Sequence, residues 1–297
     1  MVRLKTVALF LIMLSFPGIA RTQKAPQTAP RANTSQVQAA SLLKRSTTRY
    51  ETRRFAYGGT LTMIGPPSGS IVIEGWQRSE VEISANIEWQ AGSEQDLAQL
   101  VMVNNFVLDE DANHLRILST GTHDKAFMRR VAKKFPRNLL GLPWKIDYRI
   151  KVPLATDLEI NAGNGPVTLS GVEGAVRISA LESDTKLTLT GGNVSVTVLR
   201  GSVNLEIPAR GWRGSGADIK LAAGTMTIDL PAGFNADINA DLLRLGAIEN
   251  SYPELLPREL AGHTPRSMRA RAGSGGATLT FTVGDGTIRI KKMTAEP

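Results

Sequence analysis

A short phrase that recurs every nine residues is the feature that most constrains this chain. Between Gly165 and Ile207, an apolar residue returns with this spacing and a second apolar residue follows two positions later. The first column contains Val167, Val176, Thr185, Val194 and Val203. The second column contains Leu169, Ile178, Leu187, Val196 and Leu205. A third column of small residues, two positions ahead of the first, contains Gly165, Gly174, Ser183, Gly192 and Gly201.

This pattern predicts a series of short β-strands. Apolar residues two positions apart point to one face of a strand, and the residues between them, such as Thr168 and Lys186, are mostly polar. Each unit is therefore a half-buried strand of about five residues followed by a turn. The small residue permits a backbone angle that a branched side chain would resist. A fixed period also predicts that each strand lands in the same place one step along.

Two architectures fit the repeat. In a flat β-solenoid, two units make one coil of about eighteen residues, and alternate units build two facing sheets. In an antiparallel meander, or in a β-sandwich with chance regularity, successive units pair as hairpins. Strict spacing favours the solenoid, because meander turns vary freely in length. We therefore predict an all-β fold, a single-chain parallel β-helix or β-solenoid with a short capping helix and a basic helical insertion.

Composition limits the chemistry that is available. The 297 residues suffice for one large β domain or two small ones, and an aromatic content of 5% suits a narrow core. The absence of cysteine excludes disulfides, thiolate metal sites and cysteine nucleophiles.

The positive charge is unevenly distributed along the chain. The net charge is +8, of which the leader contributes +2, the segment 21–54 contributes +7 and the segment 125–145 contributes +7, leaving −8 for the rest. The β body is therefore acidic, and the cations gather in one tail and one insertion. This segregation indicates contact with anionic surfaces or simple solvation, and no nucleic-acid partner is expected.

The chain begins with a predicted secretory signal at 1–20. Arg3 and Lys5 precede an apolar run over 7–16, and Gly18 and Ala20 are the small residues that a signal peptidase reads. The run is shorter than the ~20 residues of a membrane span, which favours cleavage over an uncleaved anchor. We expect an exported protein, periplasmic or extracellular, with no transmembrane span in the mature chain.

The remaining boundaries follow from composition. Residues 21–49 are predicted to form a disordered linker, because they contain too little apolar surface to fold. Residues 50–292 form the predicted β-solenoid domain with an insertion at 124–145, and 293–297 form a C-terminal tail. Within the domain, Leu97, Leu100 and Val101 fall at helical spacing after Ser93, a capping residue. We expect this short helix to cover an open end of the solenoid.

The insertion has the pattern of a basic amphipathic helix. Phe127, Val131 and Phe135 recur every four residues, which predicts about three turns ending at Pro136. The apolar stripe either docks on the protein body or dips into an anionic envelope surface, and docking is favoured. The candidate surface-binding residues are Arg129, Arg130, Lys133, Lys134, Arg137 and Trp144.

Several phrases resemble the bacterial putative-adhesin family of exported β-solenoid proteins. They lie at 152–160 (VPLATDLEI), 163–169 (GNGPVTL), 230–237 (LPAGFNAD) and 284–290 (GDGTIRI). The resemblance covers roughly 50–292 and implies a parallel β-helix and an envelope location. It supplies no catalytic residues, and it does not extend to the insertion or to the long excursion after Leu242.

No catalytic, cofactor or metal site is predicted. The three histidines, at 114, 123 and 263, match no zinc spacing. A glycan-cleaving β-helix would need a pair of carboxylates ~5 to 10 Å apart. The carboxylates that such an enzyme could use are Glu159, Asp184, Glu206 and Asp218. Trp212 either stacks on a sugar or packs at the rim of a turn.

These observations predict a non-enzymatic, exported β-solenoid that acts as a cell-envelope scaffold or an adhesion module. Its expected partners are envelope components, namely anionic lipid, glycan or protein. One alternative is a glycan-binding or glycan-cleaving β-helix. Another is a peripheral binder of anionic envelope surfaces that works through the basic insertion.

Overall fold

The computed structural model describes residues 42–131, 134–258 and 264–293, which all belong to one compact unit, Ala40–Pro297. The prediction of an all-β fold is confirmed. The first strands are β1 (Leu43–Arg54), β2 (Thr60–Ile64), β3 (Ile71–Trp76), β4 (Glu80–Ala91), β5 (Asn105–Asp111), β6 (His114–Thr120), β7 (Trp144–Pro153), β8 (Asp157–Asn164) and β9 (Val167–Ser170). They are followed by β10 (Val176–Thr188), β11 (Gly191–Glu206), β12 (Arg213–Leu230), β13 (Ala236–Leu242), β14 (Gly246–Asn250), β15 (Leu255–Pro257), β16 (Ser267–Ala272) and β17 (Thr278–Lys292). The helices of the described residues are α1 (Glu94–Val103), α2 (Lys125–Val131) and a 3₁₀-helix (Arg137–Leu139).

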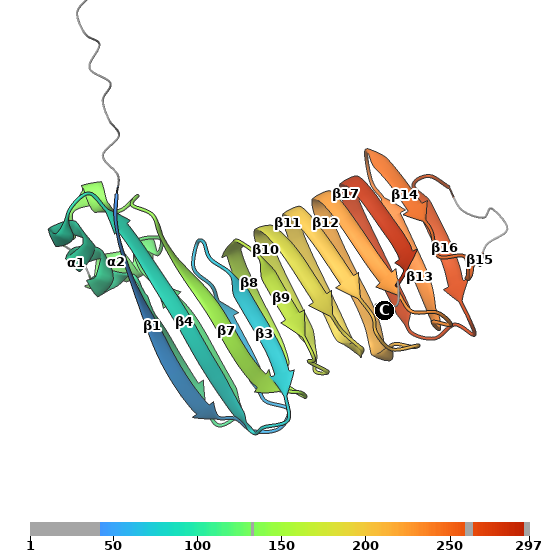
Figure 1. The fold of residues 1–297 in the computed structure, drawn as a ribbon, viewed down its shortest axis with the longest axis horizontal. Coiled ribbons are helices and arrows are strands. Elements are labelled where there is room, and N and C mark those ends of the chain that lie inside the picture. The colour runs from blue at the N-terminus through green and yellow to red at the C-terminus, as the bar shows by residue number, and fades with distance from the viewer. Residues whose placement is uncertain (1–41, 132–133, 259–263, 294–297) are drawn as a thin grey trace, which may run out of the picture. The chain divides into compact units, whose positions relative to one another are not determined.

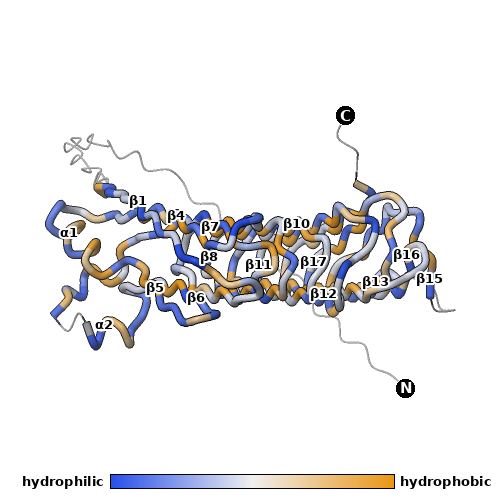
Figure 2. Tube along the Cα trace, turned by 90° about the horizontal axis from the view of Figure 1, so that it is seen from below, coloured by the Kyte–Doolittle hydropathy of each residue, from blue (hydrophilic) through white to orange (hydrophobic). Residues whose placement is uncertain are grey.

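The strands form two facing layers with an apolar interior (Figure 1, Figure 2). One layer has the order β1–β4–β7–β3–β9–β10–β11–β12–β17–β14. The other has the order β5–β6–β2–β8–β10–β11–β12–β17–β13–β16–β15. The long strands β10, β11, β12 and β17 occur in both orders, because each runs through a corner from one layer into the other.

The nine-residue columns line the interior between these layers. All residues of both apolar columns are buried, and the second column, from Leu169 to Leu205, is at most 1% exposed. Strands β10 and β11 are parallel, with Val176 opposite Val194 and Leu187 opposite Leu205. Residues that lie opposite each other on these two strands are thus two repeat units apart in the chain.

The sheet as a whole is mixed. Strand pairs β1–β4, β4–β7, β5–β6, β13–β16 and β15–β16 are antiparallel. A wholly parallel β-helix is therefore not confirmed. Among these pairs β5–β6 is joined by a short turn, whereas β1–β4, β4–β7 and β13–β16 pair strands that are not consecutive in the chain. Outside Gly165–Ile207 the period lapses, and antiparallel pairing appears toward both ends of the layers.

A column of residues without large side chains occupies the corner through which the long strands pass. Its members in neighbouring strands are Gly69, Gly165, Ser183, Gly201, Gly224, Gly286 and Gly246. Gly201 has a φ of 127°, which only glycine adopts readily, and a Cβ there would strike the carbonyl oxygen of Ser183. The same clash would occur between Gly224 and the carbonyl oxygen of Gly201.

The substitution Gly201→Ala tests whether this close approach supports the fold. We expect it to lower the free energy of unfolding by more than about 3 kcal/mol, because it adds backbone strain to a clash with a main-chain oxygen. The control is Gly233→Ala, where φ is 68° and no atom lies within 4 Å of the new Cβ. That change should cost about 1–2 kcal/mol. If chemical denaturation shows an equal loss of unfolding free energy in the two variants, the contact with the Ser183 carbonyl oxygen does not support the fold.

A second pair of substitutions tests the strand register. Leu187 is fully buried, and Lys186, one position earlier, faces solvent. Leu187→Asp should therefore destabilise the protein by more than about 3 kcal/mol, because it places an unpaired carboxylate between the layers. Lys186→Asp should change stability by less than about 0.5 kcal/mol. Similar melting temperatures for the two variants would contradict the register.

The helix predicted after Ser93 is present as α1. The Ser93 side chain accepts a hydrogen bond from the backbone N–H of Asp96 at 3.2 Å and so caps the helix. Leu97, Leu100 and Val103 are buried, and the first two join the core between the layers. Strand β1 remains an edge strand whose described pairing is with β4 alone. The helix thus closes the interior rather than the strand edge.

Two predicted boundaries shift in the structure. β1 begins at Leu43, so residues 43–49 of the predicted linker 21–49 belong to a strand. Met293, the first residue of the predicted tail, donates a backbone hydrogen bond to Leu230 at 2.8 Å. The predicted signal 1–20, linker residues 21–41 and tail residues 294–297 lie outside the described residues.

Candidate functional site

The insertion contains a helix, which is described over seven residues as α2, Lys125–Val131, and the 3₁₀-helix follows after Pro136. Residues 132–133 of the predicted helix lie outside the described residues. Asp124 starts α2 by accepting hydrogen bonds from the backbone N–H groups of Ala126 at 2.8 Å and Phe127 at 3.0 Å. These bonds, chiefly the one from Phe127, hold the pKa of Asp124 below its usual value.

The apolar side chains of the insertion dock on the protein body. Met128 and Leu139 are buried, and Phe135 and Leu142 pack against the core. The docking interpretation is the one that the geometry supports. Trp144 goes further, because it is only 6% exposed and begins β7 opposite Trp89 of β4. The expectation that Trp144 contacts a surface is therefore wrong: cross-strand packing in the interior takes its side chain away from solvent.

The cations of the insertion face solvent and form no ion pair with another described residue. Arg129, Arg130, Lys134 and Arg137 are exposed, as is Lys125, and in the described residues none of them lies within 4.0 Å of a carboxylate. Lys133, which is predicted together with Arg129, Arg130, Lys134 and Arg137, lies outside the described residues. We call Lys125, Arg129, Arg130, Lys134 and Arg137 the basic cluster.

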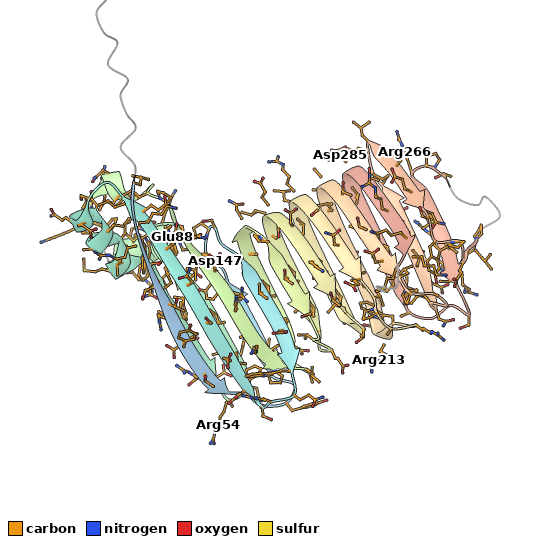
Figure 3. The ribbon with its side chains drawn as sticks, viewed as in Figure 1. Arg54, Glu88, Asp147, Arg213, Arg266 and Asp285 are labelled. Atoms are coloured by element: carbon orange, nitrogen blue, oxygen red, sulfur yellow. The ribbon has the colours of Figure 1, made fainter. Side chains whose placement is uncertain are left out.

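Elsewhere on the protein, most cations have an ion-pair partner. Examples on neighbouring strands are the pairs Arg289–Glu249 at 2.8 Å and Lys291–Asp229 at 3.3 Å, and Arg213 of β12 pairs with Glu173, between β9 and β10, at 3.2 Å. The exceptions, such as Arg54, Lys186 and Arg200, lie on separate strands, and Arg54 is at the far end of β1 from the helices (Figure 3). The basic cluster is thus a local excess of positive charge.

Exposed apolar side chains lie in the same part of the structure. Met102 on α1 is 75% exposed, and Val107 on β5 and Leu140 after the 3₁₀-helix are also exposed. Met102, Val107 and Phe127 of α2 line one cavity of about 550 Å³, so α1, β5 and α2 meet around it. We call residues 94–107 and 124–143 the helical end.

One wall of this cavity is a charged triad from β1. Glu51 accepts hydrogen bonds from Arg49 at 2.9 Å and from Arg53 at 3.0 Å, and the bond from Arg49 is the main cause of its lowered pKa. The Arg49 guanidinium also lies 4.1 Å from the centroid of the Phe106 ring. Sequence reasoning missed these residues because Arg49 falls in the predicted linker 21–49 and no apolar alternation marks Glu51 and Arg53 as part of a strand. The alternation Arg49, Glu51, Arg53 is the strand signal that could have revealed them.

The candidate carboxylates do not come together. Glu159 and Asp218 lie on strands of one layer, separated by β10 and β11, and Asp184 and Glu206 follow the corner in the other layer. Nowhere in the described part of the chain do three or more His, Asp or Glu side chains converge as metal ligands would. Trp212 is buried, and its indole N–H donates to the carbonyl of Gly192 at 3.0 Å.

Comparison with known proteins gives limited similarity. No family model matches the chain, and no curated protein matches its sequence. Among solved structures, a putative cell adhesion protein from Clostridium sporogenes is 14% identical, with a TM-score of 0.44 over 83% of this chain and 100% of that chain. A putative adhesin from Bacteroides fragilis is 10% identical, with a TM-score of 0.33 over 83% and 97% of the two chains. A putative lipid binding protein from Parabacteroides distasonis is 13% identical, with a TM-score of 0.23 over 83% and 97%.

The Bacteroides fragilis protein carries the name of the family that the sequence motifs resemble, and the Clostridium sporogenes protein is named for cell adhesion. Among the described residues, no helix is both long enough and apolar enough to cross a membrane.

Proposed function

We propose that this protein is an exported, non-enzymatic β-solenoid scaffold that docks its helical end on an anionic lipid surface of the cell envelope. The observation that carries the proposal is the basic cluster, Lys125, Arg129, Arg130, Lys134 and Arg137, which has no acidic partner in the described residues and adjoins exposed apolar side chains. Such a combination suits a peripheral membrane surface better than it suits a single soluble ligand.

The magnitudes support binding that is reversible and sensitive to salt. A cation close to an anionic membrane surface contributes about 1 kcal/mol, and this attraction falls off over a Debye length of about 8 Å at physiological salt. Five cations together therefore provide enough energy for association without permanent insertion. Met102, Val107 and Leu140 add apolar area that can enter the headgroup region.

The rest of the protein suits a scaffold. The middle strands β10, β11 and β12 stack in parallel with the repeat columns between them, which is the arrangement expected of a solenoid. Their outward carboxylates are dispersed or paired, as in Lys220–Asp218 at 2.6 Å, which supports a non-enzymatic role. The start of β1 lies beside α1, because Arg45 pairs with Glu94.

A glycan-binding function has less support. Trp212 is buried, and the Trp76 ring has the Arg78 guanidinium 4.8 Å and the Lys151 ammonium 5.4 Å from its centroid. Neither tryptophan offers a free ring face to a sugar.

Vesicle co-sedimentation tests the proposed function. We expect the purified chain to bind vesicles that contain phosphatidylglycerol and not vesicles of phosphatidylcholine alone, with less bound as salt rises. The quadruple variant Arg129→Glu, Arg130→Glu, Lys134→Glu and Arg137→Glu should bind at least about 10-fold more weakly, because attraction becomes repulsion.

The matched control reverses four exposed cations that also lack ion-pair partners but lie elsewhere. These are Arg149, Lys186, Arg200 and Arg266. This variant carries the same net charge as the first and should keep most of the binding. Equal binding to both kinds of vesicle, or equal loss in both variants, would rule out docking through the helical end.

A further inference from the structure

A row of exposed leucines runs beside the glycine corner, far from the helical end in the strand order. Leu181 of β10 is 56% exposed and Leu199 of β11 is 57% exposed, and the pairing of β10 with β11 places them side by side. The same row continues through Ala222 of β12 and Gly284 of β17 to Leu243, which is also exposed. The row therefore reads Leu, Leu, Ala, Gly, Leu across five neighbouring strands.

The two small residues leave a hollow in this row. Its volume is about 690 Å³, which lies in the range of small-molecule sites. Leu181, Leu199 and Leu243 line it, and the hydroxyls of Ser179, Thr197 and Thr282 lie along it.

The fold does not require leucine at these positions. The interior beneath the row is already filled by Ala180, Val198 and Leu221, the residues immediately before the row, which are buried. Leu181 and Leu199 point outward instead, and their exposure is a cost that the packing of the layers does not offset. Contiguous exposed apolar side chains of this kind mark binding surfaces.

The charged residues that line the hollow are both cations. Its charged lining residues are Lys220 and Arg244, and no carboxylate lines it. Each cation already pairs on one side, Lys220 with Asp218 and Arg244 with Asp285, but neither carboxylate belongs to the lining. Asp285 lies on the segment of β17 that passes the corner (Figure 3). The hollow therefore offers an apolar floor to a ligand. The Lys220 ammonium and the Arg244 guanidinium can donate hydrogen bonds to an anion there.

The shape selects the occupant. Strands are about 4.8 Å apart, so a row across five strands is roughly 19 Å long, and it is one side chain wide. A stable dimer buries at least about 1,200 Å², which needs a broader apolar patch than a single row. A linear hydrocarbon chain matches the row in length and width. We infer that the hollow binds one acyl chain of an anionic amphiphile, with its head group at Lys220 and Arg244. This site is independent of the proposed docking of the helical end.

Isothermal titration calorimetry with dodecanoate, below its critical micelle concentration, tests this inference. We expect saturable binding of one dodecanoate per chain, no binding of acetate, and weaker binding of dodecyl maltoside, which has the chain without the charge. Dodecyl phosphate in a parallel titration distinguishes a carboxylate from a phosphate head group. Absence of dodecanoate and dodecyl phosphate binding would overturn the inference.

The variant Ala222→Leu gives the sharpest test, because it adds a leucine to the row and fills the hollow from a half-buried position outside the core. It should lower the affinity for dodecanoate at least about 10-fold while leaving the melting temperature unchanged. Leu256→Ser, at an exposed leucine of β15 outside the hollow, is the control and should bind normally. Unchanged affinity in Ala222→Leu would overturn the placement of the chain.

The head-group assignment has its own variant. The double variant Lys220→Gln, Arg244→Gln should bind dodecanoate at least about 5-fold more weakly and bind dodecyl maltoside with unchanged affinity. Equally weaker binding of both ligands would contradict the head-group assignment.

Analytical ultracentrifugation tests the alternative occupant. If the wild type sediments as a dimer, Ala222→Leu sediments as a monomer, and neither binds the amphiphile, a second copy of the chain occupies the row. Vesicle binding by the helical end should be unaltered in all these variants, which separates this inference from the proposed function.

Discussion

The close approach of backbones at the glycine corner is the constraint on which the two-layer arrangement depends. β10, β11, β12 and β17 contribute to both layers only because each can turn through this corner without a side chain in the way. At Gly201, Gly224 and Gly286, the place of a Cβ is taken by a carbonyl oxygen of the neighbouring strand. Where the column has Ser183 instead, its hydroxyl is buried and lies 3.0 Å from the hydroxyl of Thr185. The strand spacing at the corner is thus fixed by the main chain.

The sequence was sufficient to predict the middle of the fold, because there the physical signal is local and repeated. The columns through Leu187 and Thr185 lie in the interior, as their spacing predicts. The small-residue column proves to be two columns: Gly165, Ser183 and Gly201 share one corner, whereas Gly174 and Gly192 neighbour each other at another turn. Both columns follow the same nine-residue period in the sequence. Only the pairing of the strands shows that alternate members belong to different corners.

The ends were harder to predict, because their stability comes from contacts between distant residues. β1 has no apolar alternation, and its inward positions carry Arg49, Glu51 and Arg53, so composition alone resembles a linker. The strand forms because β4 offers it a full-length antiparallel partner. Trp144 shows the same limit. An aromatic residue at the end of a basic stretch is typical of a surface, but pairing with Trp89 across β4 and β7 places it in the core.

Charge and register together explain where the candidate surfaces lie. On neighbouring strands of the stack, a cation of one strand comes beside a carboxylate of the next, as in Arg289–Glu249 and Lys291–Asp229, so the flat faces carry little unbalanced charge. The insertion stands outside this register, and Arg129, Arg130 and Arg137 have no strand neighbour that could supply an acid. Leu181 and Leu199 are in register, but the strand alternation points them outward just before the corner, so the stacking of the layers does not require an apolar side chain there. Positions that the stacking of strands does not determine are therefore the positions at which this protein can carry a function.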